Sequence, residues 1–464
     1  MSPNPTHDST PTNGLAGSFP ADFTFGVATS SFQIEGAVDA DGKTPSIWDS
    51  FCAEPGRVID GDTGEVAVDH YRRMPGDVEL MRELGMGAYR FSISWPRVQP
   101  HGTGPGNAAG IGFYDRLVDE LLAAGITPWA TLYHWDLPVE LEQAGGWPVR
   151  ETAERFAEYA GIVAEALGDR LRHLITLNEP WCSAFLGYAS GIHAPGRRDP
   201  AAALAASHHL LLGHGMAVEA IRAAAPDAQV GITLNLYPTD PAGEGEGYAD
   251  AVRRIDGLSN RWFLDPVFGR GYPADVVADV AHVTDLAFVH DGDTDRIAAP
   301  LDFLGVNYYT RHVVAPSAYP GTNAVDFRFR GYPTTATGWE IDPDGLYDVV
   351  SRVRDDYPSI PIVLTENGAA FDDEVADDGS VHDPDRVAFL REHLQAAARL
   401  LKDGVDLRGY FAWSLMDNFE WAEGYAKRFG IVHVDYATQR RTPKSSALWY
   451  AALLREHAGG ILGT

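Results

Sequence analysis

The sequence predicts an α/β fold, a TIM (β/α)8 barrel with long βα loops, from three observations. Eight short apolar runs alternate with longer amphipathic stretches. Each run is apolar along nearly its whole length, which is typical of parallel strands buried on both faces. The distance between successive runs leaves room for a loop, a helix and a return to the sheet. A doubly wound sheet is the alternative, but eight units in one chain favour closure into a barrel.

The predicted strands extend over most of the chain. In order they are 25–33, 88–95, 126–134, 171–179, 229–236, 301–309, 362–366 and 407–415. Residues 151–167 and 385–402, which lie between strands, place apolar side chains at helical spacing among charged ones. Three stretches rich in Gly, Pro and Asp are expected to be long loops: 42–64, 238–247 and 316–345.

We expect a single catalytic domain over residues 18–464, preceded by a disordered tail over residues 1–17. The tail is rich in Pro, Ser, Thr and Asn, and it lacks the basic and apolar segments of a signal peptide. No apolar run reaches the length of about 18 residues that a membrane helix needs. With only Cys52 and Cys182, the chain suits a reducing compartment, so a cytoplasmic location is expected.

The charge balance excludes several classes of partner. The 464 residues carry 36 Lys and Arg against 65 Asp and Glu, a formal net charge of -29. Such a surface repels phosphate backbones and anionic lipid, so neither nucleic acid nor a membrane is an expected partner.

No metal or cofactor is implied by the sequence. His208, His209 and His214 lack the spacing of metal ligands, and residues 102–106 lack the features of a phosphate-binding loop. The oligomeric state stays open.

Polar residues stand where most of the predicted strands end. In a TIM barrel these ends meet on one face, so Glu179 and Glu366, from the fourth and seventh strands, should share a cavity. Two carboxyl groups in an aromatic cavity can cleave a glycosidic bond, since one protonates the leaving oxygen while the other attacks or activates water. Structural ion pairs are the alternative for each Glu. The turn residues that follow both, Pro180 and Asn367-Gly368, favour the catalytic interpretation.

Three motifs carry a resemblance to a known family. They are FTFGVATSSFQIEG at 23–36, TLNEP at 176–180 and IVLTENG at 362–368. These resemble the N-terminal, acid/base and nucleophile motifs of the family-one glycoside hydrolases, and the resemblance extends from residue 19 to the C-terminal region. It implies a retaining β-glucosidase that acts on terminal non-reducing β-D-glucosyl residues through a covalent glycosyl-enzyme intermediate. Substrates would be small β-glucosides or cello-oligosaccharides, as in cellulose degradation.

The same resemblance implies roles for individual residues. Glu366 would be the nucleophile and Glu179 the general acid/base, in agreement with the chemistry above. Trp181 could give the acid the less polar setting that it needs. The remaining positions that match the family are Arg90 and Tyr309 at the nucleophile, Gln33, His134, Asn178, Glu420 and Trp421 at the sugar, Trp413 beneath the sugar ring, Trp339 at the aglycone entrance, and Asn307 and Trp135 in support.

Two departures from the family's variants bear on function. Thioglucosidases carry Gln in place of the acid/base, so Glu179 argues against that branch. The family often has Tyr where this chain has Phe32, which removes a hydroxyl beside Gln33.

The intact carboxyl pair favours an enzyme over a catalytically silent sugar-binding barrel. We expect the two carboxyl groups to lie about 5–5.5 Å apart, the separation of retaining enzymes.

The choice of sugar is less constrained by the sequence. A β-galactosidase or β-fucosidase preference is the alternative to a β-glucosidase. Glu420 and Trp421 favour an unphosphorylated substrate, because a carboxylate beside a 6-phosphate would be repelled. Lys427 and Arg428, slightly later in the same loop, keep a phosphorylated substrate open.

Overall fold

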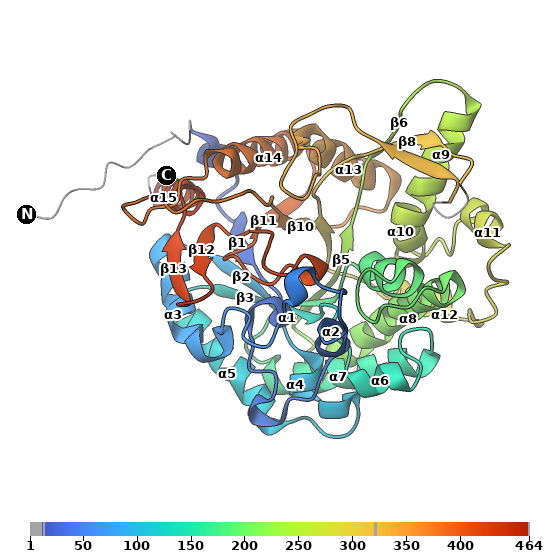
Figure 1. The fold of residues 1–464 in the computed structure, drawn as a ribbon, viewed down its shortest axis with the longest axis horizontal. Helices are drawn as coiled ribbons and strands as arrows, with labels where there is room; N and C mark the ends of the chain where they lie inside the picture. The colour runs from blue at the N-terminus through green and yellow to red at the C-terminus, as the bar shows by residue number, and fades with distance from the viewer. Residues whose placement is uncertain (1–11, 13, 320–322, 463–464) are drawn as a thin grey trace, which may run out of the picture.

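The computed structural model describes residues 12, 14–319 and 323–462, and within them it contains a closed barrel of eight parallel strands (Figure 1). Each strand pairs with its neighbours in chain order, and β1 closes the barrel against β11. The fold class predicted from the sequence is therefore confirmed. The barrel strands are β1 (Thr24–Ala28), β2 (Ala88–Ser92), β3 (Thr127–Tyr133), β4 (His173–Asn178), β5 (Gln229–Asn235), β7 (Phe303–Asn307), β10 (Ile362–Asn367) and β11 (Leu407–Trp413).

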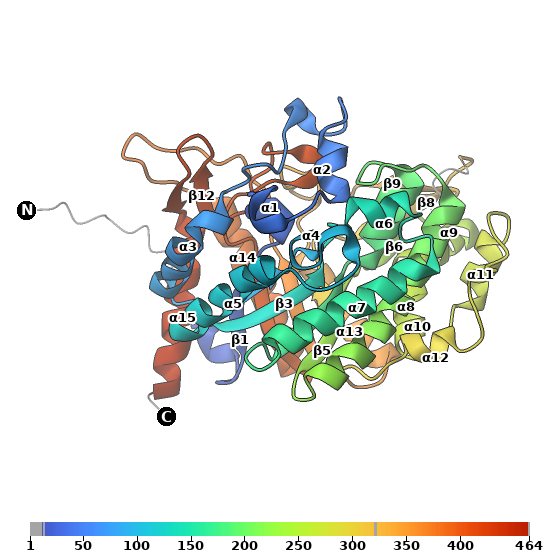
Figure 2. The ribbon, with the colours of Figure 1, turned by 90° about the horizontal axis from the view of Figure 1, so that it is seen from below.

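Long helices cover the outside of the barrel, and α7 and α8 lie side by side along it (Figure 2). The two helices predicted by periodicity are confirmed as α7 and α14, each beginning one residue earlier than predicted. The long helices are α3 (His70–Leu84), α5 (Ala108–Ala123), α7 (Arg150–Leu167), α8 (Pro200–Ala224), α9 (Glu246–Asp256), α13 (Pro343–Asp356), α14 (Pro384–Lys402) and α15 (Ser445–Leu462).

Shorter elements build the loops around the barrel. The short α-helices are α1 (Ser31–Ile34), α2 (Ile47–Cys52), α4 (Trp95–Val98), α6 (Val139–Gln143), α10 (Trp262–Val267), α11 (Ala274–Val280) and α12 (Asp293–Ile297). Two segments are π-helices, η5 (Cys182–Ser190) and η6 (Gly257–Arg261). Single 3-10 turns are η1 (Leu15–Ser18), η2 (Ala40–Gly42), η3 (Ile59–Gly61), η4 (Pro100–Gly102) and η8 (Trp421–Glu423). Two small sheets comprise β6 (Thr239–Pro241), β8 (His312–Pro316) and β9 (Val325–Arg328), and β12 (Val432–Asp435) with β13 (Arg440–Pro443).

The first two predicted strands extend furthest beyond the C-terminal ends of the observed ones. The first ends at Ala28, and Gln33 lies on α1 instead of at a strand end. The second ends at Ser92, and Trp95 begins α4. In both cases a serine, Ser30 or Ser94, stands in extended conformation just before the helix, a position that serine favours. The predicted loops 42–64, 238–247 and 316–345 also contain the short elements α2, β6 and β9.

The predicted N-terminal tail is only partly within the described residues. Residues 1–11 and 13 lie outside them. Leu15–Ser18 form η1, which packs near α14 and α15 with Leu15 and Ala16 buried. The packed chain therefore begins before residue 18, where the tail was expected to end.

Aromatic rings fill the N-terminal end of the barrel interior. Trp129 on β3, Phe303 on β7 and Phe411 on β11 point inward, with the Trp129 centroid 5.2 and 5.3 Å from the two Phe rings. Glycine leaves room for them on the neighbouring strands. A Cβ on Gly26 would lie 2.6 Å from Phe411, and one on Gly231 would lie 2.5 Å from Phe303. This plug separates the C-terminal end of the barrel from a pocket of about 330 Å³ at the N-terminal end, which Trp129 and Phe303 line from the inside.

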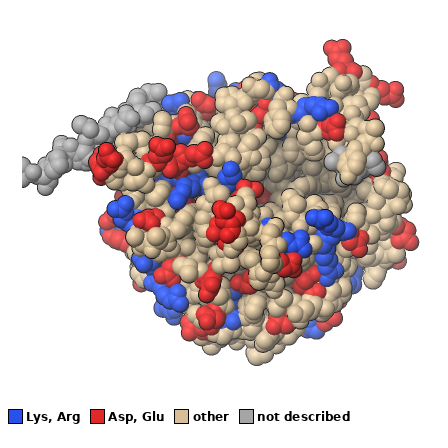
Figure 3. Space-filling model, in the orientation of Figure 1, with Lys and Arg blue, Asp and Glu red and all other residues tan. Residues whose placement is uncertain are grey.

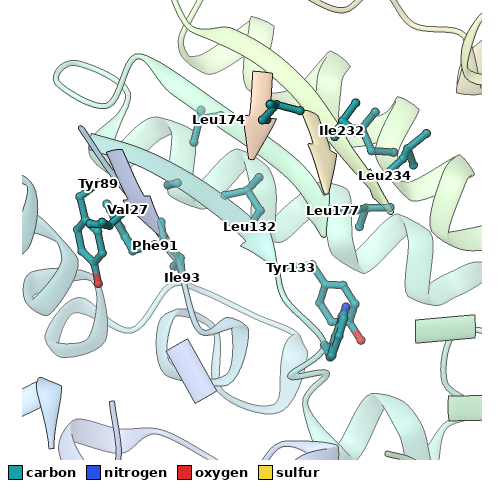
Figure 4. Packing of buried hydrophobic residues seen from close by; sticks show 14 of the residues in the cluster. Val27, Tyr89, Phe91, Ile93, Leu132, Tyr133, Leu174, Leu177, Ile232 and Leu234 are labelled. Atoms are coloured by element: carbon teal, nitrogen blue, oxygen red, sulfur yellow. The ribbon is translucent and has the colours of Figure 1, made fainter. Parts of the chain in front are cut away.

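Side chains that alternate with these inward residues pack outward against the helices. Figure 4 shows members of this outer core on β1 to β5, among them Val27, Phe91, Leu132, Leu174 and Ile232. All of these labelled side chains are at most 2% exposed. The strands are thus buried on both faces, which explains why they are apolar along nearly their whole length.

A buried ion cluster joins α15 to the loops at the C-terminal end of the barrel. Lys444 is fully buried, with its Nζ 2.5 Å from Asp373 and 2.7 Å from Asp417. Both carboxylates have other cations as well, Arg386 at Asp373 and Arg428 at Asp417. Burial alone would raise the pKa of Asp417, but Lys444 and Arg428 hold it below its usual value.

We predict that Lys444→Met lowers the free energy of unfolding by roughly 3 kcal/mol, because it leaves buried negative charge undercompensated. Urea unfolding followed by fluorescence and circular dichroism measures the change, and coincidence of the two probes checks cooperativity. Lys402→Met, at an exposed position at the end of α14, is the control and should have little effect. Equal stability of the two variants would contradict the prediction.

Candidate active site

A cavity of about 650 Å³ opens at the C-terminal ends of the strands. Figure 3 shows a hollow in the molecular face at this end of the barrel, among interspersed acidic and basic side chains. Nine of the predicted site residues line the cavity: His134, Trp135, Glu179, Tyr309, Trp339, Glu366, Trp413, Glu420 and Trp421. The other four, Gln33, Arg90, Asn178 and Asn307, lie buried behind that lining and contact it through hydrogen bonds.

Glu366, at the end of β10, has a donor on each carboxylate oxygen. Arg90 Nη1 donates to Oε1 over 2.5 Å, and the Tyr309 hydroxyl donates to Oε2 over 2.6 Å. Tyr309 follows β7, which pairs with β10, whereas Arg90 comes from β2, which is not adjacent to β10 in the barrel. A guanidinium and a hydroxyl in contact stabilise negative charge on this carboxylate.

Glu179, directly after β4, lies in a different environment. It is 6% exposed, and among the described residues its oxygens accept an amide hydrogen bond from Asn307, over 2.7 Å, and a contact of 3.2 Å from the thiol of Cys182. Burial, together with the charge of Glu366, raises the pKa of Glu179 to about 7. Its backbone has a φ of 47°, a left-handed conformation that costs of order 1–3 kcal/mol and is typical of functional sites.

Asn178 and Asn307 connect the surroundings of the two carboxyl groups. Asn178 Oδ1 accepts from Arg90 over 2.6 Å and from Asn307 over 3.2 Å. Asn307 in turn accepts from the Thr365 hydroxyl over 2.7 Å, next to Glu366 in the chain. The amide of Asn307 is thereby oriented with its nitrogen toward Glu179.

His134 lines the cavity, and one of its buried ring nitrogens has no hydrogen-bond partner among the described residues. Asn178 Nδ2 lies 3.0 Å from its Nε2, so Nε2 accepts and the ring hydrogen is on Nδ1. That Nδ1 is buried and has no partner among the described residues. Burial and the charge of Arg90 lower the pKa of His134 well below its usual value, so the ring is neutral. A neutral imidazole with an unpaired N–H is suited to a sugar hydroxyl.

Gln33, which is buried behind the cavity lining, contacts Glu420 on the cavity wall. Gln33 Nε2 donates to Phe419 O over 2.8 Å, to Asn418 over 3.0 Å and to Glu420 Oε2 over 3.3 Å, while Ser30 donates to its Oε1. Burial and the charge of Glu366 raise the pKa of Glu420 to about 8. Without substrate, Glu420 therefore holds a proton at neutral pH, whereas the sequence argument assumed a carboxylate.

Aromatic rings form much of the remaining wall. Trp413 and Trp421 are 5% and 4% exposed, and Trp339 is half-buried with its ring 5.3 Å from that of Tyr309. Trp135 also contributes a hydrogen bond, from Nε1 to the carbonyl of Asn178 over 2.9 Å. Phe32 stacks on Trp421 at 6.0 Å. Since Gln33 has its partners from other residues, the absent hydroxyl at Phe32 leaves no gap there.

The structure also brings in residues that the sequence argument did not place in the cavity. Tyr237, His193 and Lys427 line it, and Cys182 lines it as well and contacts Glu179 directly. Cys182 could have been suspected from its position three residues after Glu179 on a helix. Tyr237 and His193 carry no motif that would have marked them.

The two basic residues of the β11 loop face different ways. Lys427 lines the cavity and donates to the carbonyl of Ala336 over 2.8 Å. Arg428 instead pairs with the buried Asp417.

The three histidines considered as metal ligands pack in the core. His208 contacts Asp293 and Tyr272, His209 contacts the Trp147 carbonyl, and His214 contacts Thr176. Over the described part of the chain, no cluster of His, Cys, Asp and Glu is placed to hold a metal ion, and no helix has the length and apolarity to cross a membrane.

Comparison with known proteins agrees with this site. The family model described as Glycosyl hydrolase family 1 matches residues 15–458. The chain belongs to this family. A bifunctional β-D-glucosidase/β-D-fucosidase of Bifidobacterium breve is 49% identical to this family 1 enzyme, with 95% of this chain and 99% of the relative covered. β-Glucosidase A of Thermotoga maritima is 47% identical over 95% of this chain and 98% of its own length. The solved structure of a family 1 β-glucosidase from Thermotoga maritima superposes with a TM-score of 0.92, at 47% identity over 95% of this chain and 98% of that one.

We predict that Glu366→Gln lowers the pKa of Glu179. The charge of Glu366 disfavours ionisation of its neighbour, so removing it favours the ionised form and should shift the pKa down from about 7 by about 1 unit. Carbon-13 NMR of labelled glutamate carboxyl groups, followed against pH, measures this. Glu423→Gln, which removes a carboxylate at the cavity rim, is the control. An unchanged or raised pKa in Glu366→Gln would be contrary to the proposed coupling.

Proposed function

We propose that this family 1 enzyme is a retaining β-glucosidase in which Glu366 is the nucleophile and Glu179 the general acid/base. The observation that carries the assignment is the unequal environment of the two carboxyl groups across one cavity. Glu366 has a guanidinium and a hydroxyl on its oxygens, whereas Glu179 is buried with weaker donors and has a pKa of about 7. One is suited to attack as an anion, and the other to give and take a proton near neutral pH.

In the first step, Glu179 gives its proton to the glycosidic oxygen as Glu366 attacks the anomeric carbon. The bond to the leaving alcohol breaks, and the sugar becomes an ester of Glu366. Esterification removes the negative charge of Glu366, and with it one of the causes that raise the pKa of Glu179. Glu179 is then better suited to act as the base. It takes a proton from a water molecule as the oxygen of that water attacks the anomeric carbon. The ester bond to Glu366 breaks, Glu366 becomes a carboxylate again, and the released sugar has the β configuration.

The rest of the cavity is suited to holding one terminal sugar. His134 offers an unpaired N–H, and Glu420 with Gln33 offers a cluster of donors and acceptors for adjacent hydroxyls. Trp413 and Trp421 provide apolar faces for the C–H groups of the ring. We propose Asn178, Asn307, Arg90 and Trp135 as residues that position these groups, and Trp339 as part of the aglycone entrance. Small β-glucosides or cello-oligosaccharides would be the substrates, and a role in cellulose degradation would follow from the latter.

A β-fucosidase activity is a second candidate, because the relative from Bifidobacterium breve is named for both activities. No comparable observation favours β-galactosidase. Both cysteines are buried and unpaired, which supports a reducing, cytoplasmic setting.

Glu366→Gly should reduce kcat for an aryl β-glucoside by more than about 10⁴-fold, since no covalent intermediate can form. Added azide should restore turnover and give an α-glucosyl azide, because azide occupies the position of the lost carboxylate. Product NMR and the azide dependence of the rate test both points. Glu179→Gln is the matched variant: it should lose most activity on poor leaving groups and little on dinitrophenyl β-glucoside. A β-configured azide from Glu366→Gly would reverse the assignment.

We further predict that the wild-type enzyme has a higher kcat/KM for a β-glucoside than for its 6-phosphate. Three carboxyl groups, Glu179, Glu366 and Glu420, already share the cavity, so additional negative charge is disfavoured even with Glu420 protonated. Glu420→Ser should lower kcat/KM for the glucoside by about 100-fold through lost hydrogen bonds to hydroxyls. Steady-state kinetics on the two substrates measure both values of kcat/KM. A higher kcat/KM for the 6-phosphate would contradict the prediction and would favour phosphate recognition through Lys427.

A further inference from the structure

A thiol contacts the acid/base carboxyl group, and the mechanism above gives it no role. Cys182 is the first residue of η5, and its Sγ lies 3.2 Å from Glu179 Oε2. The residue is 7% exposed and lines the cavity. Because an ionised carboxylate can only accept, the S–H is the donor in this contact when Glu179 is charged.

The two oxygens of Glu179 are not equivalent. Oε1 accepts from Asn307 Nδ2 over 2.7 Å, and the amide nitrogen is a donor in every protonation state. The proton that Glu179 must deliver to the substrate is therefore favoured on Oε2, the oxygen next to Cys182. Sulfur is both a weak donor and a weak acceptor, so the same contact can persist when Oε2 is protonated and the direction of the hydrogen bond reverses.

A second residue orients the thiol. Asn235, at the end of β5, places Nδ2 3.7 Å from Cys182 Sγ and 3.4 Å from the Tyr237 hydroxyl. When Asn235 donates to the sulfur, the S–H is left to point toward Glu179. Burial and the nearby charge of Glu179 raise the pKa of Cys182 well above its usual value, so the group is a neutral thiol throughout the working range.

We propose that Cys182 is a positioning residue for the reaction: its thiol holds Oε2 of Glu179 through a weak hydrogen bond of reversible direction, and Asn235 fixes the orientation of that thiol. The proposal rests on the proposed acid/base role of Glu179. A weak donor matters here, because a hydroxyl at the same place would stabilise the ionised carboxylate more strongly and draw the proton away from the substrate.

Several other groups face Glu179 and set the background for this effect. Glu366 opposes its ionisation and Arg90 favours it, and Glu420 adds to the repulsion only at a pH at which it has lost its own proton. Tyr309 and Tyr237 also lie close enough to interact with its charge. Substitution at Cys182 leaves all of these unchanged, so a shift in the titration of Glu179 would report on the thiol contact itself.

The test is the pH dependence of kcat/KM on a poor leaving group, whose basic limb reports the acid in the free enzyme. Cys182→Ser should shift that limb to lower pH, because the hydroxyl is the stronger donor. Cys182→Ala and Cys182→Val remove the donor and should shift it to higher pH, each change being about 0.5–1 unit. Valine keeps the packing volume, so one of the two apolar variants remains informative if the other folds poorly.

Cys52→Ser is the matched control, since Cys52 is equally buried but lies on α2, and it should leave the limb at the wild-type pH. Asn235→Ala should move the limb in the direction of Cys182→Ala, and the two changes should not add in the double variant. The proposal is overturned if serine and alanine shift the limb in the same direction or leave it unmoved. Failure of the wild-type enzyme on every β-glycoside would instead overturn the proposed function.

Discussion

The buried contact between Arg90 and Glu366 is the interaction on which the rest of the site depends. Glu179, Glu366 and Glu420 line one cavity, and a guanidinium with no exposed surface reaches one of them. Burial opposes charge on all three, and each ionised group opposes the next. By pairing with Glu366 and not with the others, Arg90 favours one anion, and the charge of that anion then raises the pKa of Glu179 and of Glu420. The division of labour that we propose for Glu366 and Glu179 therefore follows from which carboxylate the cation contacts.

The barrel brings these groups together through small irregularities in its sheet. The pairing register shifts between Ile175 and Asn178 on β4 and between Leu364 and Glu366 on β10, just before the two glutamates. A shift of this kind redirects the side chains that follow it. The left-handed backbone at Glu179 has the same effect on β4, and the hydrogen bond from its amide to the Thr233 carbonyl holds it in place. The regular part of each strand stabilises the fold, whereas the irregular end positions the chemistry.

The sequence predicted those features that depend on patterns along the chain. Buried parallel strands must be apolar, and strand ends in a closed barrel must converge, so the fold and the shared cavity of Glu179 and Glu366 followed from spacing. The sequence predicts a strand through Gln33, because Ser30 and Ser31 are the main residues that mark the change from β1 to α1. The protonated state of Glu420 could not be foreseen, because it depends on how closely a loop folds over two other acids. The contact of Cys182 with Glu179 depends likewise on the local turn after Glu179, in which the Cys182 amide donates to the Glu179 carbonyl over 2.9 Å.

The loop that carries Glu420 shows how distant residues support the site. Asp417 begins this loop, and its Oδ1 accepts from Lys444 and from the backbone amide of Gly430, at the loop's other end. Gly430 must be a glycine here, since a Cβ would lie 2.0 Å from the amide nitrogen of Asp417. With both ends held together, Asn418 and Glu420 project toward Gln33. A long loop ordered by solvent-exposed contacts would hold a sugar-binding carboxyl group loosely. Because Asp417 and Lys444 at its base are fully buried, the loop gains the rigidity of the barrel core while its tip lines the cavity.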